Sequence, residues 1–326
     1  MKFFHLSDLH IGKHLHSYSL YELQRDVFQQ IVEKAIEKRP DAILISGDIY
    51  DKSVPSGEAY TLFDGFLSDL SEITPKIPVL IIAGNHDSAE RLNYASGFLE
   101  RHGIILEVLP PRSLEEELKK ITLTDEFGDV DFYLLPFMKP GYVRYLFEDG
   151  KSISYQKAVQ TVLERADIDY DRRNVLLSHQ FYINGNHEPE TCESELSYIS
   201  VGGVDSVDIS VVDKFDYVAL GHIHGAQIVG KNHIRYCGTP LKYSVSEEKH
   251  EKAIAMVTLG DKGSEITFES IPLRSIRDVR SEKGRLHEIL ERATEANRHD
   301  YVSITLTDEE ELYQPKDKLE EVYDHI

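Results

Sequence analysis

Short apolar runs alternate with longer amphipathic segments along the first hundred residues. The runs 3–6, 42–45 and 79–83 have the length and composition of buried strands. Each is followed by a segment whose apolar residues recur at helical spacing, and the predicted helices are 20–39, 57–70 and 89–101. The last of these helices is expected to start at Asp87 and Ser88 as capping residues. Strands alternating with helices predict a layered α/β sheet.

Beyond residue 104 the pattern becomes richer in strands. The segments 121–124 and 130–135, joined by Phe127-Gly128-Asp129, predict a β-hairpin, and a helix is expected over 155–166. Further strand-like stretches are 175–177, 215–220, 233–237, 253–259 and 266–271. We therefore expect two sheets with helices on their outer faces.

The charge density rises after Pro272, and the spacing of apolar residues changes with it. Segments 276–279, 286–293 and 301–306 predict a small βαβ unit, and a last helix is expected over 316–325. The predicted domains are therefore 1–272 and 273–326.

Composition restricts the possible partners and the compartment. The chain has 326 residues with 57 acidic against 36 basic side chains, and its net charge of -21 opposes free association with polyanions. Its two cysteines, Cys192 and Cys237, form no C-x-x-C pair, so neither a disulfide framework nor a thiolate metal site is indicated. No window approaches the roughly 18 apolar residues of a membrane span. We expect a soluble cytoplasmic protein with no membrane partner.

Side chains able to bind metals follow five of the predicted strands directly. The five clusters are Asp8-Leu9-His10, Gly47-Asp48-Ile49-Tyr50-Asp51, Gly84-Asn85-His86-Asp87, Ser178-His179-Gln180 and Gly221-His222-Ile223-His224. In α/β sheets, binding sites form beyond the carboxyl ends of the strands. Each cluster alone could be an exposed loop, a turn, a helix cap or a satisfied core histidine. Their joint occurrence after apolar strands favours one shared site.

The residue types in these clusters specify the chemistry of that site. Carboxylate, amide oxygen and imidazole without thiolate suit Mn²⁺, Fe²⁺ or Zn²⁺ in a mixed oxygen and nitrogen site. Seven candidate ligands exceed the needs of one ion, whereas two ions sharing a carboxylate would use them all, as in enzymes of phosphoryl displacement. The candidates are Asp8, His10, Asp48, Asn85, His179, His222 and His224. Gly47, Gly84 and Gly221 would let the backbone come close to the ions.

This succession resembles the calcineurin-like metallophosphoesterase superfamily over the first domain. The strings GNHDSAERL, SHQF and CGTPLKYSVSE are most similar to its bacterial DNA-repair nuclease subunits. The resemblance implies a two-sheet metallophosphoesterase sandwich flanked by helices, with a small α+β capping domain at the C-terminus. It further implies two divalent ions, with Mn²⁺ as the expected metal, bridged by Asp48. One ion is assigned to Asp8, His10, Asp48 and His224, and the other to Asp48, Asn85, His179 and His222.

Two further residues receive catalytic roles through this resemblance. His86 is expected to face the scissile phosphate, where it could stabilise the transition state or protonate the leaving alkoxide. The alternative is that His86 only caps the helix beginning near Ser88. Asp51 stands where archaeal and eukaryotic relatives usually have histidine, and its carboxylate could orient His86 or stabilise its charged form.

The resemblance implies exonuclease and endonuclease activity on double-stranded DNA ends and hairpins, in repair and recombination. It also implies an ATPase as partner and a homodimer. Since family members commonly run longer, one interpretation is that the capping domain is incomplete at Ile326, which would impair binding of the ATPase.

Three other functions compete with that of a DNA nuclease. Protein phosphatases of the superfamily carry GDxVDRG and GNHE, whereas this chain has GDIYDK and GNHD. A small-molecule phosphodiesterase or nucleotidase is the main alternative, favoured by the acidic net charge because DNA affinity rests largely on Lys and Arg. A scaffold without catalysis is disfavoured because all seven ligands and His86 are present.

Overall fold

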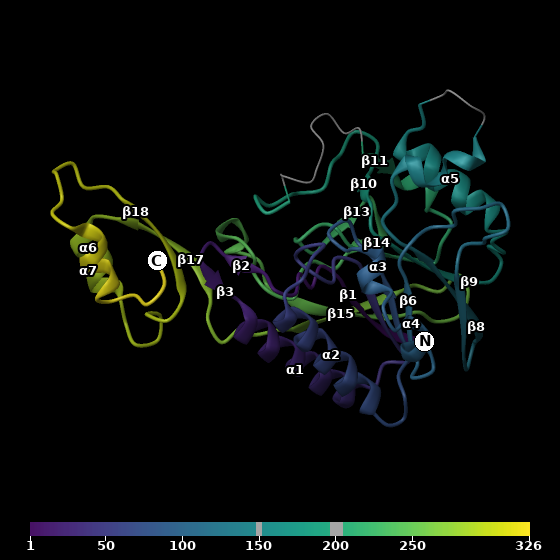
Figure 1. The fold of residues 1–326 in the computed structure, drawn as a ribbon, viewed down its shortest axis with the longest axis horizontal. Helices are drawn as coiled ribbons and strands as arrows, with labels where there is room; N and C mark the ends of the chain where they lie inside the picture. The colour runs from purple at the N-terminus through teal and green to yellow at the C-terminus, as the bar shows by residue number, and fades with distance from the viewer. Residues whose placement is uncertain (148–151, 196–204) are drawn as a thin grey trace.

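The computed structural model describes residues 1–147, 152–195 and 205–326, and its main body is a sandwich of two six-stranded sheets (Figure 1). In the first sheet, β1, β4, β5 and β6 are parallel to their neighbours, and β15 and β16 are antiparallel. The bounds of its strands are β1 Lys2–Leu6, β4 Ala42–Ser46, β5 Val79–Ile82, β6 Ile104–Glu107, β15 Ala253–Thr258 and β16 Thr267–Pro272. The two-sheet prediction is confirmed.

The second sheet has a parallel centre and antiparallel edges. Strands β8, β9, β12 and β14 run parallel, while β7 and β13 pair antiparallel at the two ends. Their bounds are β7 Lys120–Asp125, β8 Gly128–Leu135, β9 Arg173–Ser178, β12 Tyr217–Leu220, β13 Gln227–Val229 and β14 Lys231–Tyr236. Hairpin β7–β8 is the one predicted from the sequence.

An apolar core joins the two sheets, and helices cover their outer faces. Phe3 of the first sheet packs edge-on against Phe132 of the second, with ring centroids 5.8 Å apart. Helices α1 (Tyr21–Lys38) and α2 (Gly57–Glu72) bury their apolar faces on the first sheet, and α5 (Tyr155–Arg165) covers the second. The Ser56 and Ser154 side chains cap α2 and α5 by accepting backbone N–H bonds. These helices agree with the predicted ones.

The expected helix over 89–101 is wrong, because two short helices occupy this segment. They are α3 (Ala89–Leu92) and α4 (Ser96–Glu100), separated at Ala95, which has the left-handed φ of 61°. No residue of α4 is buried, so burial of an apolar face does not hold the two pieces in one helix. Ser88 makes no side-chain capping bond, and Asp87 has a different role described below.

The C-terminal residues form a small α+β unit with its own core, seen as the yellow lobe beside the sandwich in Figure 1. Strands β17 (Val279–Gly284) and β18 (Tyr301–Leu306) are parallel, and α6 (Leu286–Arg292) connects them, as the βαβ prediction requires. The first strand was expected at 276–279, but Ile276 is exposed and pairing starts at Val279. Helix α7 (Pro315–Glu320) is shorter than expected, because the chain leaves it to pair with β18 through the bond from Val302 N–H to His325 C=O.

Short elements complete the described chain. They are β2 (His14–Leu15), β3 (Tyr18–Ser19), β10 (Phe181–Ile183), β11 (Ser206–Asp208) and the 3₁₀ helices η1 (Pro140–Leu146), η2 (Ile209–Val211) and η3 (Val245–Glu247). None of the helices in the described residues is both long and apolar enough to cross a membrane.

Candidate metal centre

Five loops from the two sheets converge at one edge of the sandwich. Strands β1, β4 and β5 are parallel in one sheet and β9 and β12 in the other, so the loops that follow them leave from the carboxyl ends. Backbone bonds continue between the loops, from Asp8 N–H to Gly47 C=O at 2.9 Å and from Gly221 N–H to Ser178 C=O at 3.0 Å. Ser46 joins the sheets by donating to the Ala219 carbonyl at 3.0 Å. The loops are thus held in register with one another.

Asp8, His10 and His224 form the first group of potential ligands. One ligand atom from each lies within 4.8 Å of the others, and all three residues are buried. The Nε2 atoms of His10 and His224 are 3.1 Å apart. The Asp8 carboxylate accepts the backbone N–H of His222 at 3.0 Å, which fixes its direction.

Asp48, Asn85, His179 and His222 form the second group. The Asn85 side-chain oxygen lies 3.1 Å from His179 Nε2 and 2.9 Å from His222 Nδ1. Asp48 Oδ2 lies 3.4 Å from His179 Nε2 and 3.8 Å from His10 Nε2, so it reaches both groups. The structure therefore brings all seven predicted ligands together, with Asp48 between the two groups.

The electrostatics of this cluster fit divalent cations. Asp8 and Asp48 are buried, and within the described part of the chain the ion-pair partners of Asp48 are histidines only. Burial raises the pKa of Asp8, and burial lowers the pKa of His222 to about 3, which leaves its imidazole neutral with a lone pair. Buried carboxylates surrounded by neutral imidazoles need a compensating positive charge. The oxygen and nitrogen donors match Mn²⁺, Fe²⁺ or Zn²⁺.

His179 illustrates how binding of a cation would couple to a proton. Burial lowers its pKa, but the Asp48 carboxylate outweighs burial and raises the pKa to about 9. Its Nδ1 donates to the Ser46 carbonyl at 2.7 Å, so the exchangeable proton is on Nε2, the atom facing Asp48 and Asn85. A cation at this position would displace that proton.

Three glycines are required because ligand side chains and their supports pack against their Cα atoms. A Cβ atom would lie 2.1 Å from Asp48 Oδ1 if built on Gly84, 2.2 Å from His179 Nδ1 if built on Gly47, and 1.8 Å from the Ser46 carbonyl oxygen if built on Gly221. All three distances are below any real Cβ contact. The glycines thus make room for the ligands and the groups that hold them.

His86 and Asp51 meet beside the cluster. His86 Nδ1 donates to the main-chain carbonyl of Asp51 at 2.8 Å, and its Nε2 lies 3.8 Å from Asp48 Oδ2. The Asp51 carboxylate instead pairs with Lys13 Nζ at 2.7 Å. The contact between these two residues is therefore one that any residue at position 51 could supply.

Two supporting side chains were not found from the sequence. Asp87 accepts backbone N–H bonds from Gly84, Ile49 and Tyr50 at 2.9 to 3.1 Å, which ties the second loop to the third. Gln24 on α1 donates to the Leu9 and His10 carbonyls at 3.2 and 2.8 Å. The available signal was a polar residue on the buried face of an otherwise apolar helix.

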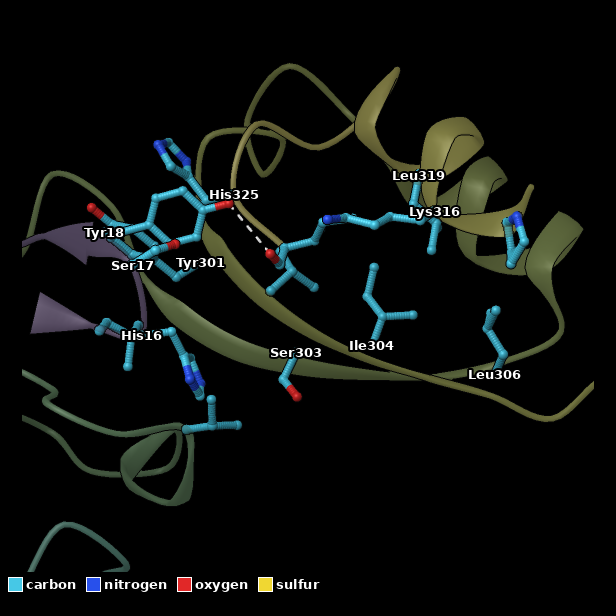
Figure 2. A pocket seen from close by; sticks show the side chains of 15 residues that line it. His16, Ser17, Tyr18, Tyr301, Ser303, Ile304, Leu306, Lys316, Leu319 and His325 are labelled. Carbon is cyan, nitrogen blue, oxygen red and sulfur yellow. Dashed lines mark hydrogen bonds between the residues drawn. The ribbon is translucent and has the colours of Figure 1, made fainter.

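A second cavity lies away from this chemistry, between hairpin β2–β3 and the C-terminal unit (Figure 2). Its lining includes His16, Tyr18, Tyr301, Ile304 and His325, and none of the seven candidate ligands. Tyr18 packs against Tyr301 and His325, with ring centroids 5.5 and 5.0 Å apart. This cavity marks the contact between the two units and not the metal centre.

Comparison with known proteins defines the class. The sequence model of the calcineurin-like phosphoesterase family matches residues 1–226, and that of the type 5 capsule protein repressor C-terminal domain matches residues 272–326. The chain belongs to the calcineurin-like phosphoesterase family and is a metal-dependent phosphodiesterase. Among its curated relatives is SbcD, the smaller-lettered component of the nuclease SbcCD, from Staphylococcus epidermidis. It is 32% identical over 330 residues, which cover 100% of this chain and 84% of the relative. This similarity makes the chain an SbcD homologue.

Solved structures also match the chain, at low identity. A dimetal phosphatase from Danio rerio is 13% identical with a TM-score of 0.49, and the match covers 84% of this chain and 97% of that one. GAP50, the anchor in the inner membrane complex of Plasmodium, is 12% identical with a TM-score of 0.45, covering 84% and 89%.

Proposed function

We propose that this chain is a dinuclear-metal-dependent DNA nuclease that cuts phosphodiester bonds both at DNA ends and internally. The observation that carries the proposal is the convergence of seven oxygen and nitrogen ligands and His86 from five loops. Similarity over the whole chain to a protein named as part of a nuclease supports DNA as the substrate.

In this proposal the two groups of ligands hold two ions. Asp8, His10, Asp48 and His224 hold one, Asp48, Asn85, His179 and His222 hold the other, and Mn²⁺ is the proposed metal. When bound, such a pair activates water and neutralises charge on the phosphate. The buried ligands orient and space the pair, and the three glycines keep the ligands packed.

His86 has the geometry of an acid in this reaction. Its Nδ1 hydrogen is committed to the Asp51 carbonyl, so Nε2 is the atom that can carry a proton toward the cleft. We propose that it stabilises the transferring phosphoryl group or protonates the leaving oxygen. The pairing of Asp51 with Lys13 would keep this loop in place.

A small-molecule phosphodiesterase or nucleotidase is the second candidate, because the net charge of -21 opposes DNA binding. The test compares Mn²⁺-dependent cleavage of linear duplex DNA, hairpin DNA and a chromogenic phosphodiester. We expect cleavage of both DNAs that chelation of the metal abolishes. Turnover of the chromogenic ester with both DNAs left intact would favour the second candidate, and no turnover of any substrate would favour a scaffold.

The remaining parts of the proposal concern partners. Residues 273–326 are proposed to form a capping domain beside the nuclease domain 1–272, supported by their separate core. Because the curated relative is named as part of SbcCD, we propose an SbcC-type ATPase partner and a role in DNA repair and recombination in the cytoplasm.

A homodimer is proposed through the face formed by α2, α3 and α4. Tyr94 and Phe98 are 83% and 62% exposed there, beside Tyr60 and Phe63 of α2. Exposed aromatic patches of this kind mark protein interfaces. We expect the wild type to sediment as a dimer and the double variant Tyr94→Asp, Phe98→Asp as a monomer with unchanged far-UV circular dichroism.

The matched control is Ile276→Asp, at a 58% exposed residue of the C-terminal unit, which should remain dimeric. A wild type that sediments as a monomer at micromolar concentration would contradict this interface.

A further inference from the structure

A fully buried carboxylate, Glu247, lies directly behind His224. Glu247 ends η3 and is 0% exposed. Its Oε1 lies 3.2 Å from His224 Nδ1, and its Oε2 accepts from Lys252 Nζ at 2.7 Å. The Ser194 hydroxyl, 3.0 Å from the same His224 nitrogen, donates to Oε1 at 3.2 Å. An anion is thus buried against a ligand histidine, on the side away from the other ligands.

These contacts determine the tautomer of His224. An ionised carboxylate can only accept hydrogen bonds, and the serine donates its one hydrogen to Glu247, so His224 Nδ1 must carry the hydrogen. The lone pair is then on Nε2. That atom faces the first group of ligands, 3.1 Å from His10 Nε2.

Lys252 holds the main chain of His224 as well as Glu247. Its ammonium group donates to the His224 carbonyl at 3.1 Å and to Thr239 Oγ1 at 2.6 Å. Lys252 lies immediately before β15, the strand that pairs with β1, and Asp8 follows β1. The pair thus connects the loop carrying His224 to the sheet whose edge carries Asp8.

The other imidazoles are supported differently within the described residues. His179 Nδ1 is held by the Ser46 main-chain carbonyl at 2.7 Å, and buried His10 Nδ1 has no hydrogen-bond partner. Carboxylates that hold the second nitrogen of a metal-binding histidine fix its orientation and raise its basicity.

We propose that Glu247, held by Lys252, is a positioning residue that fixes His224 for one of the two ions and so controls the affinity of that subsite. The inference rests on the proposed dinuclear site. It adds a carboxylate that touches neither the ions nor the substrate but acts through His224.

The test is calorimetric titration of metal-free full-length protein with Mn²⁺ alone. We expect the wild type to bind two ions. In Glu247→Gln, one of the two sites should weaken about tenfold or more while the other stays within about twofold of wild type. The double variant Glu247→Gln, Lys252→Met avoids leaving an unpaired buried ammonium and should show the same selective loss.

Glu282→Gln is the matched control, because Glu282 is a partly buried glutamate paired with Arg280 and Arg292 in the C-terminal unit. It should bind both ions as the wild type does. Unchanged affinities in both Glu247 variants would overturn the inference alone. So would equal weakening of both sites with a lowered melting temperature of the metal-free protein, since that indicates general destabilisation. A wild type that binds fewer than two ions would instead overturn the proposed dinuclear function.

Discussion

Replacing Asp48 with Asn is expected to abolish phosphodiester cleavage, with a loss of at least about 10³-fold. Asp48 Oδ2 lies 3.4 Å from His179 Nε2 and 3.8 Å from both His10 Nε2 and His86 Nε2, and no other carboxylate reaches both groups of ligands in the described residues. An amide keeps the shape but removes the negative charge and one of the two acceptor oxygens. The measurement is cleavage of linear duplex DNA in Mn²⁺, together with calorimetric metal binding.

Asp131→Asn serves as the control, because Asp131 is also buried but pairs with Arg172 and belongs to neither group of ligands. Its activity should stay near wild type. If Asp48→Asn retained two tightly bound ions and most of its activity, the central role given to Asp48 would be wrong.

Replacing His86 with Ala is expected to lower turnover by about 10² or more while both ions still bind. The substitution removes the imidazole near the cluster but keeps the backbone N–H of residue 86, which donates to Asp48 Oδ1 at 2.9 Å. Metal binding should therefore be preserved, and the loss should appear in kcat. Single-turnover cleavage at saturating Mn²⁺, with calorimetry beside it, separates the two quantities.

An exposed histidine of the C-terminal unit provides the comparison. His287→Ala should leave both turnover and metal binding unchanged, because His287 is on the solvent side of α6. Full activity in His86→Ala would refute an acid role for His86, and loss of an ion would assign it to metal binding.

The sandwich could be predicted because its signals are local. Runs such as 42–45 and 79–83 are buried on both faces and therefore uniformly apolar, and α1 and α2 repeat apolar residues along one face. Prediction failed where local pattern and burial part company. The segment 89–101 has helical composition but lacks a buried face over α4, and the residues after α7 pair with β18 instead of continuing the helix.

The sequence by itself determined the ligand types, their placement after apolar strands and their likeness to a family, because these depend on residue identity and spacing along the chain. Only the tertiary structure decided which side chains support them. Gln24, Asp87, Glu247 and Lys252 act across contacts between separate loops, and Glu247 is 23 residues from the histidine it holds. A hydrogen bond requires a separation near 3 Å and a suitable angle. Those conditions are set by how two sheets pack, which no local pattern in the chain encodes.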